Sequence, residues 1–157
     1  MRSPSADAPE VALGHDYLLV LRGAERVFCE IAAIWPNAPI HTLLADEHDE
    51  MLRERLGGRT VHVSSLQRLG VRQDGFRALL PLYPLAAGRM RIEAYGVLVT
   101  DSSAFAIGFR PPPGVPHVCY CHSPFRYAWH AREQALAEQP AILRPAVGAL
   151  LDRIRRW

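Results

Sequence analysis

Hydrophobic and polar residues change along the chain in blocks whose spacing predicts strands that alternate with helices. Near-continuous apolar runs predict buried strands at 10–17, 38–45, 59–65, 95–103 and 116–122. In 22–35 the apolar residues Val27, Ile31 and Ile34 recur at helical spacing instead, and Pro36 ends that helix. This alternation predicts an α/β fold, a Rossmann-like three-layer α/β/α domain with a mostly parallel sheet.

The segments between these strands are predicted to be shorter helices and turns. Residues 46–56 are a charged helix that Gly57 and Gly58 end. An apolar helical segment at 76–90 contains two prolines, which kink or divide it. Residues 104–109 are expected to form a short strand or a turn.

The organisation of the chain follows from these elements. We expect a flexible N-terminus at 1–9, which is rich in proline, serine and alanine, and a Rossmann-like domain at 10–130. Residues 131–157 are expected to be helices that are broken near Pro140 and Pro145 and lead to a further domain.

Composition and charge exclude several classes of function. The 157 residues carry a formal net charge of only +2, so no nucleic-acid partner is expected. All 18 basic residues are arginine, so the chain has no lysine for a Schiff base or a P-loop. No G-x-G-x-x-G motif occurs, which argues against a nicotinamide or flavin enzyme.

The cysteines indicate a reducing compartment rather than a metal site. The chain has three cysteines, no apolar signal segment and no run of 18 apolar residues, which favours a cytoplasmic location. On a strand, His117, Cys119 and Cys121 share one face while His122 points to the other, so these side chains do not converge on one ion. No metal or other cofactor is therefore expected.

Polar side chains end three of the predicted strands. They are His15 and Asp16, then Asp101, Ser102 and Ser103, and finally His122 and Ser123. Because the carboxyl ends of parallel strands meet at one edge of a sheet, where ligands bind, we expect these groups to surround a cleft. The apolar part of 117–122 is then core, and its end opens into the cleft. A purely structural histidine is the alternative for His122.

Two other segments offer groups for an anionic ligand. Gly23 and Ala24 form a small-residue turn at a helix start, where free N–H groups favour an anion; an ordinary strand-to-helix turn is the alternative. Arg126 lies near the start of a later helix and is a second candidate for such a contact.

The C-terminal segment 142–157 is amphipathic and basic at its end. Its apolar stripe is Ile142, Leu143, Val147, Leu150, Leu151 and Ile154. We expect a helix whose apolar face covers this domain or a partner domain. The alternative is peripheral contact of Arg153, Arg155, Arg156 and Trp157 with an anionic membrane.

Six segments, in this order, resemble the N-terminal domain of glycosyltransferase family 4 enzymes of the bacterial polysaccharide and mannosyltransferase type. They are "HDY…RGAE", "WPNAPIHTL", "SSLQRL", "FRALLPLYPLA", "YGVLVTDSSAFA" and "HVCYCHSPFRYAW", and they cover about residues 10–130. The resemblance implies the GT-B architecture, in which two Rossmann-like domains face each other and the N-terminal one mainly holds the acceptor. It implies retaining transfer of a sugar from a nucleotide sugar to a glycan or lipid-linked acceptor, without a metal.

The resemblance also implies roles for individual residues. It makes His122 and Asp16 catalytic and places Arg22, Gly23 and Ala24 in the loop beside the donor phosphates. Together, the resemblance and the polar strand ends give the acceptor-binding residues His15, Tyr17, Glu25, Ser102, Ser103, Ser123 and Arg126.

The resemblance covers only part of such an enzyme. Family members are more than twice as long, and an E-x7-E element in their C-terminal half helps to hold the donor; this chain has no two glutamates eight residues apart. We therefore expect the acceptor half of a glycosyltransferase, inactive alone. The alternatives are a non-catalytic domain that binds a glycan or a partner protein, and a different Rossmann-type enzyme such as a metal-assisted hydrolase.

Overall fold

The chain divides into two compact units, residues 1–122 and 123–157. The computed structural model describes residues 10–46, 48–70, 73, 75–92 and 96–157. The N-terminus that was expected to be flexible, 1–9, lies outside the described residues. The first unit ends at His122, so the expected domain boundary after residue 130 falls within the second unit.

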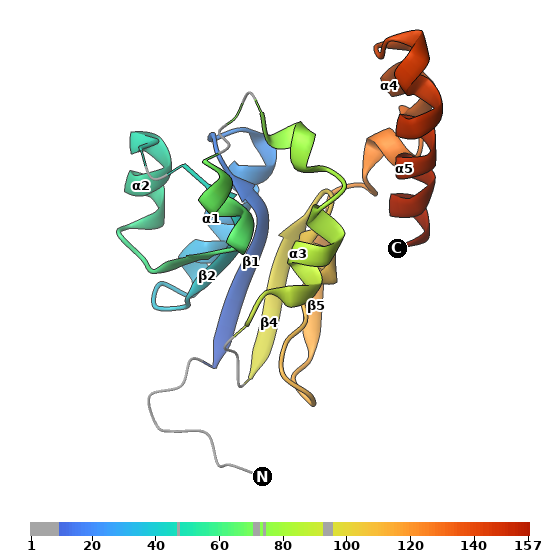
Figure 1. Ribbon diagram of the computed structural model, residues 1–157. Helices are drawn as coiled ribbons and strands as arrows, with labels where there is room; N and C mark the ends of the chain where they lie inside the picture. The colour runs from blue at the N-terminus through green and yellow to red at the C-terminus, as the bar shows by residue number, and fades with distance from the viewer. Residues whose placement is uncertain (1–9, 47, 71–72, 74, 93–95) are drawn as a thin grey trace. The chain divides into compact units, whose positions relative to one another are not determined.

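The first unit is built on a five-stranded parallel sheet with the strand order β3-β2-β1-β4-β5. The strands are Val11–Leu18 (β1), Ile40–Ala45 (β2), Val61–Val63 (β3), Val97–Ser102 (β4) and His117–Cys121 (β5). Figure 1 shows β1, β4 and β5 side by side. The predicted α/β fold with a Rossmann-like parallel sheet is therefore confirmed, and β1 lies at its centre.

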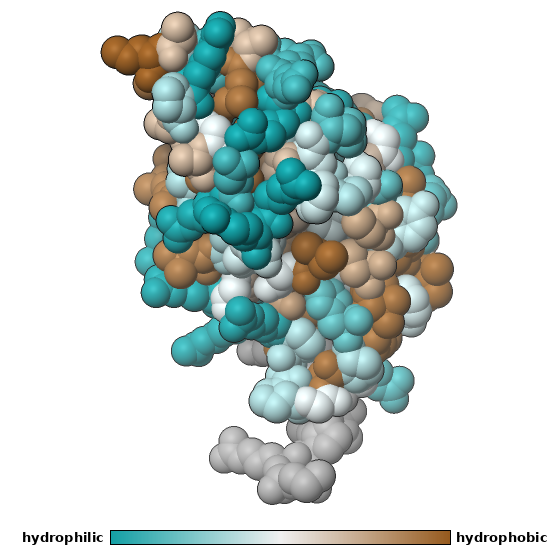
Figure 2. All heavy atoms as spheres, turned by 90° about the vertical axis from the view of Figure 1, so that its right-hand side faces the viewer, coloured by the Kyte–Doolittle hydropathy of each residue, from teal (hydrophilic) through white to brown (hydrophobic). Residues whose placement is uncertain are grey.

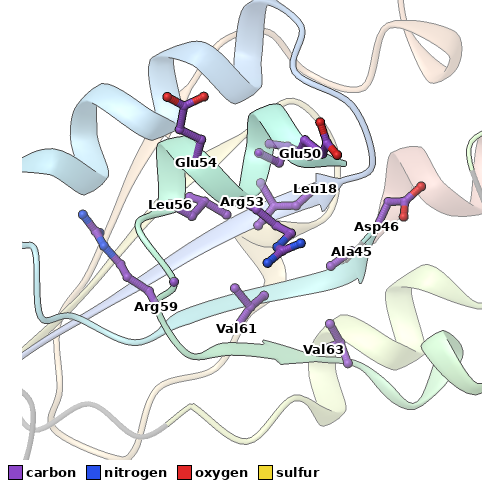
Figure 3. A pocket seen from close by; sticks show the side chains of 12 residues that line it. Leu18, Ala45, Asp46, Glu50, Arg53, Glu54, Leu56, Arg59, Val61 and Val63 are labelled. Atoms are coloured by element: carbon purple, nitrogen blue, oxygen red, sulfur yellow. The ribbon is translucent and has the colours of Figure 1, made fainter. Parts of the chain in front are cut away.

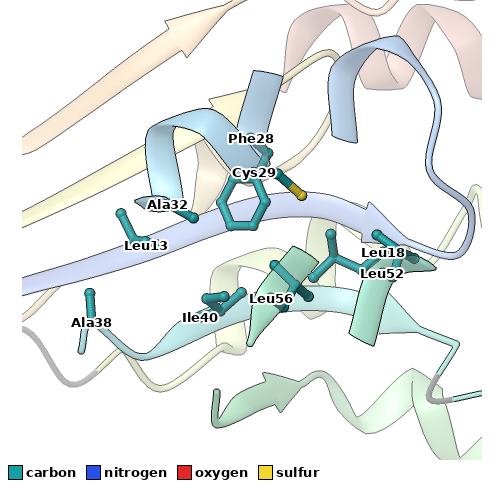
Figure 4. Packing of buried hydrophobic residues seen from close by; sticks show 9 residues of the cluster. All are labelled: Leu13, Leu18, Phe28, Cys29, Ala32, Ala38, Ile40, Leu52 and Leu56. Carbon is teal, nitrogen blue, oxygen red and sulfur yellow. The ribbon is translucent and has the colours of Figure 1, made fainter. Parts of the chain in front are cut away.

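Helices α1 (Gly23–Ile34) and α2 (Glu50–Leu56) pack on one face of this sheet. Their buried side chains meet those of β1 and β2 in one apolar cluster, which Figure 4 shows: Leu13, Leu18, Phe28, Cys29, Ala32, Ala38, Ile40, Leu52 and Leu56. Burying a side chain such as Phe28 contributes about 1.5–3 kcal/mol to stability. This apolar packing fixes α1 against the sheet and so sets the position of its first turn.

Shorter helices pack against the other face. They are the 3-10 helices η2 (Phe76–Leu79) and η3 (Ala106–Gly108) and the α-helix α3 (Tyr83–Arg89). The buried ring of Tyr83 lies 5.2 Å from that of Phe105 and 5.0 Å from that of Tyr17. The 76–90 segment is divided at Pro81, as predicted, whereas Pro84 lies in the first turn of α3. Residues 106–108, within the expected strand or turn at 104–109, form a helical turn.

Two element boundaries differ from the prediction because polar side chains cap the backbone there. The helix predicted from residue 46 begins at Glu50, since the Asp49 carboxylate accepts the Leu52 N–H at 2.9 Å. Gly57, at a φ of 63°, ends that helix as predicted. β3 is shorter than 59–65 because the Ser64 hydroxyl accepts the Leu66 N–H at 3.2 Å and begins the 3-10 helix η1 (Ser65–Leu69).

The prediction that the apolar part of 117–122 is core is wrong. Val118 is 56% exposed and Tyr120 is 53% exposed. The reason is topological: β5 is an edge strand, so β4 is its only neighbour among the described strands. A continuous apolar run is typical of a central parallel strand, and this run lacks the alternation that would mark an edge strand.

The second unit consists of the 3-10 helices η4 (Arg126–Ala128) and η5 (Ala141–Leu143) and the α-helices α4 (Arg132–Ala137) and α5 (Arg144–Arg156). Pro145 lies in the first turn of α5 and begins the helix instead of breaking it. Leu151 and Ile154 of α5 are buried, and the Arg155 guanidinium lies 4.3 Å from the centre of the Trp129 ring.

The predicted apolar stripe of 142–157 is only partly buried. Ile142 is 87% exposed and Leu143 is 48% exposed, because both precede α5 instead of lying on its packed face. In Figure 2, hydrophobic and hydrophilic side chains are interspersed on the face turned to the viewer. Among the helices of the described ranges, none combines the length and the apolar character that crossing a membrane requires.

A glycine on β1 tests the packing of the sheet. A Cβ on Gly14 would lie 2.7 Å from Thr100 Cγ2 and 3.0 Å from the Phe109 ring. Because this space is filled, Gly14→Ala is expected to lower the free energy of unfolding by about 2 kcal/mol. Urea denaturation measures this change. Gly23→Ala is the control, since a Cβ there meets nothing within 4 Å. Equal midpoints for the two variants would contradict the described packing.

Candidate functional site

A buried carboxylate at the carboxyl edge of the sheet joins two histidines from the neighbouring strands. Asp101, near the end of β4, lies opposite His15 of β1 in the sheet register. His15 Nδ1 lies 2.9 Å from an Asp101 carboxylate oxygen, and His122 Nε2 lies 3.0 and 2.9 Å from the two oxygens. The side chains of Asp101 and His15 are 0% and 2% exposed, whereas that of His122 is 22% exposed. We call these three residues the His-Asp-His cluster.

Ser102 links this cluster to the second buried carboxylate, that of Asp16. The Ser102 carbonyl accepts the His122 N–H at 3.1 Å, and its hydroxyl donates to Asp16 Oδ1 at 2.9 Å. The three strand ends that the sequence analysis singled out therefore do lie together at one edge of the sheet. His122 reaches Asp101 directly and is connected to Asp16 through Ser102.

Both oxygens of Asp16 are occupied by the loop that follows β4. The N–H of Ser103 donates to Oδ2 at 2.6 Å, while those of Phe105 and Ala106 donate to Oδ1 at 2.8 and 2.6 Å. Asp16 is 4% exposed. Charge-assisted hydrogen bonds of this kind are the strong ones, so Asp16 fixes the path of residues 102–106 beside the cluster.

The surroundings of His15 favour its charged form. Burial alone lowers the pKa of His15, but the hydrogen bond to Asp101 and the charges of Asp16, Asp101 and Glu25 outweigh it, so the pKa is raised. His15 therefore contributes stability below its ordinary pKa of 6.5, and this is lost as the pH rises through the raised pKa. The imidazole also stacks on Phe28 of α1, with ring centres 4.9 Å apart.

The turn at Arg22, Gly23 and Ala24 forms the start of α1. The Arg22 N–H donates to a Glu25 carboxylate oxygen at 3.0 Å, so Glu25 occupies a helix N-terminal N–H that an anion would otherwise meet. The space in front of Gly23 is open, because a Cβ there would contact nothing within 4 Å. The contact of His15 with Phe28 of α1 places this helix, which the turn begins, beside the His-Asp-His cluster.

Other predicted acceptor-binding residues have different surroundings. Tyr17 packs between Phe76 and Tyr83, and its pKa is raised well above its ordinary value by burial and by the nearby Asp16 charge. Ser103 is half-buried in the loop that Asp16 holds.

Ser123 and Arg126 belong to the second unit. Arg126 is exposed there, and its guanidinium donates to the Tyr127 hydroxyl at 2.7 Å. The helix predicted to start near Arg126 is instead the short 3-10 helix η4, which ends at Ala128.

The cysteine-rich strand β5 has its own arrangement. His117 Nε2 lies 2.8 Å from the Thr100 hydroxyl, and burial lowers the pKa of His117. Burial raises the pKa of Cys119, which keeps this thiol protonated at neutral pH. Within the described ranges, no three histidine, cysteine, aspartate or glutamate side chains are placed to hold a metal ion.

A groove of about 620 Å³ lies elsewhere, between α2 and the strands β2 and β3. Figure 3 shows Arg53 extending from α2 toward these strands, over the apolar side chains of Val61 and Val63. None of the predicted site residues lines this groove. We place the candidate site at the His-Asp-His cluster because titratable side chains from three strands converge there.

Asp101 is the residue that sequence reasoning did not select. Asp101 was recognised as a polar residue at a strand end, but the catalytic role was assigned to Asp16 and the acceptor-binding roles to Ser102 and Ser103. The sequence shows only that Asp101 lies at a polar strand end; its place between the strands that lead to His15 and His122 comes from the strand order of the sheet.

The chain matched no protein-family model, no curated protein and no solved structure. The fold and the geometry of this edge therefore carry the functional argument.

Proposed function

We propose that this chain is the acceptor-side half of a retaining glycosyltransferase. The observation that carries the proposal is the His-Asp-His cluster at the carboxyl edge of a Rossmann-like sheet, beside the open turn at Gly23. Ligands of open parallel sheets bind at this edge. The sequence resemblance to family 4 enzymes names a sugar as the ligand.

The groups at this edge suit a neutral, hydroxyl-rich molecule. His122 has one ring nitrogen on Asp101, and the other, Nδ1, has no partner in the part of the chain that the structure describes. In this proposal Nδ1 meets a sugar hydroxyl, while the positive end of α1 at Gly23 lies toward the donor diphosphate. Asp16 acts by holding the loop 102–106 in place.

The partners proposed are a nucleotide sugar and a glycan or lipid-linked acceptor. A second domain would supply the groups that grip the donor, so the chain alone is expected to turn over negligibly. We propose a cytoplasmic location with peripheral contact to the inner face of the membrane. The arginines at the end of α5 support that contact.

Calorimetry with the full chain tests the proposal. A mannose-containing oligosaccharide is expected to bind with a dissociation constant on the order of 1 mM, equivalent to about 4 kcal/mol. His122→Ala is expected to weaken this binding about tenfold, the effect of one hydrogen bond of about 1.4 kcal/mol. His48→Ala, on an exposed residue, is the control and should bind as the wild type does.

Two results would contradict this assignment. Unchanged affinity in His122→Ala would remove His122 from the sugar site. Rapid sugar transfer by the chain alone from GDP-mannose or UDP-glucose would show that it is not half of an active site.

A non-catalytic glycan-binding domain is the second candidate. It is favoured by the state of Asp16, whose two oxygens are both occupied by the chain itself and so offer no free carboxylate to an acceptor. Binding that survives in His122→Ala, together with no effect of a nucleotide sugar on acceptor affinity, would favour this candidate.

A further inference from the structure

We infer that Asp101 is a positioning residue: it fixes His122 in the Nε2–H tautomer, so that Nδ1 faces a ligand as a hydrogen-bond acceptor. The inference rests on the proposed function in one respect only, namely that the ligand is a sugar with a hydroxyl to donate. The tautomer itself follows from the geometry of the cluster.

The first step is the proton on His15. Its Nδ1 lies 2.9 Å from an Asp101 carboxylate oxygen and 3.1 Å from the Asp101 backbone carbonyl oxygen. Both partners are acceptors, so Nδ1 must carry the hydrogen. His15 thus donates to Asp101, whose carboxylate is the acceptor.

The second step is the proton on His122. Its Nε2 lies within 3.0 Å of both oxygens of the same carboxylate. An ionised carboxylate only accepts hydrogen bonds, so Nε2 must be the donor as well. In the neutral imidazole the other nitrogen is then an acceptor, which leaves the Nδ1 lone pair free for a ligand O–H.

The third step is rigidity. Asp101 has no exposed side-chain surface and is held from two sides by His15 and His122. The His122 ring also makes an edge-to-face contact with the Tyr120 ring, with ring centres 5.0 Å apart. Because Asp101 cannot turn to solvent, it sets both the orientation and the tautomer of the imidazole, as a carboxylate bonded to one ring nitrogen does for other functional histidines.

The substitution Asp101→Asn separates positioning from simple packing. Asparagine has nearly the same shape, but its amide can donate to Nε2 and so favours the Nδ1–H tautomer. Asp46→Asn is the matched control, since Asp46 follows β2 at the same edge and its carboxylate contacts only the His48 N–H among the described residues.

The test is side-chain nitrogen NMR of the full chain with labelled histidines. It reports which ring nitrogen of His122 carries the hydrogen at a pH where His122 is neutral. The wild type and Asp46→Asn are expected to show His122 protonated at Nε2, and Asp101→Asn is expected to show it largely protonated at Nδ1. An Nδ1–H tautomer in the wild type would overturn the inference, and this arm does not depend on the folding of any variant. An unchanged tautomer in a folded Asp101→Asn would overturn it too.

Sugar binding then distinguishes this inference from the proposed function. If Asp101 acts through His122, Asp101→Asn and His122→Ala should each weaken oligosaccharide binding about tenfold, and the double variant should bind no worse than either. Additive losses would overturn the positioning role. The expected tautomers without any sugar binding would support the inference and contradict the proposed function.

Discussion

Replacing Asp16 by alanine is expected to lower the free energy of unfolding by about 4 kcal/mol. The carboxylate accepts hydrogen bonds from the Ser102 hydroxyl and from the N–H groups of Ser103, Phe105 and Ala106, and the variant leaves these donors without their acceptor. Urea denaturation followed by circular dichroism measures the change, with the slope of the transition checked against the wild type.

Two further variants test whether this loss of stability comes from the hydrogen bonds that Asp16 accepts. Asp16→Asn keeps one carbonyl oxygen, so it is expected to lose about half as much stability. Asp46→Ala removes a carboxylate at the same edge that accepts only the N–H of His48 among the described residues, and it should cost less than about 1 kcal/mol. Equal losses in Asp16→Ala and Asp46→Ala would contradict the role given to Asp16.

Replacing His41 by phenylalanine is expected to stabilise the protein, and more so in acid. His41 is 1% exposed, and neither ring nitrogen has a hydrogen-bond partner among the described residues. Removing two unpaired polar atoms from the core at pH 8 should raise the free energy of unfolding by about 1–3 kcal/mol. The phenyl ring can keep the stacking on His62, whose ring centre lies 4.8 Å away.

The acid effect follows from the pKa of His41. Burial, together with the charge of His62, lowers the pKa of His41 from 6.5 to about 4. The unfolded chain therefore takes up a proton as the pH falls below 6.5, while the folded protein does not. Between pH 6.5 and 4 the free energy of unfolding of the wild type should therefore fall by about 3 kcal/mol more than that of the variant.

Urea denaturation of both proteins at several pH values between 8 and 4 is the measurement. A constant difference in stability across this range would contradict the burial of a neutral His41. His41→Leu serves as a second variant if the larger phenyl ring strains the sheet.

Much of the fold was predictable because it depends on local patterns. The helix α1 was predicted from the spacing of Val27, Ile31 and Ile34, and its end from Pro36. Its buried residues are instead Phe28, Cys29 and Ala32, and Ile34 is 65% exposed. The parallel sheet followed from apolar runs that alternate with helices. These signals are repeated over many residues. The helix cap at Asp49 was not recognised, and this shifted the predicted start of α2 without changing the predicted fold.

The parts that were not predictable depend on neighbours that are distant in the sequence. Val118 and Tyr120 have the composition of a core strand, and only the strand order shows that β5 lies at an edge. Asp16 was predicted to be catalytic, but its carboxylate accepts hydrogen bonds from N–H groups of the loop 102–106. These bonds depend on the turn that follows β4. The importance of Asp101 likewise appears only when β1, β4 and β5 are placed side by side.

Amide chemical-shift mapping of the labelled 157-residue chain with a mannose-containing oligosaccharide shows where on this chain a sugar binds. We expect the largest shifts at His15, Gly23, Ser103 and His122, around the His-Asp-His cluster. Shifts concentrated instead at Arg53, Val61 and Val63, in the groove beneath α2, would contradict it, and so would the absence of any shift at millimolar sugar.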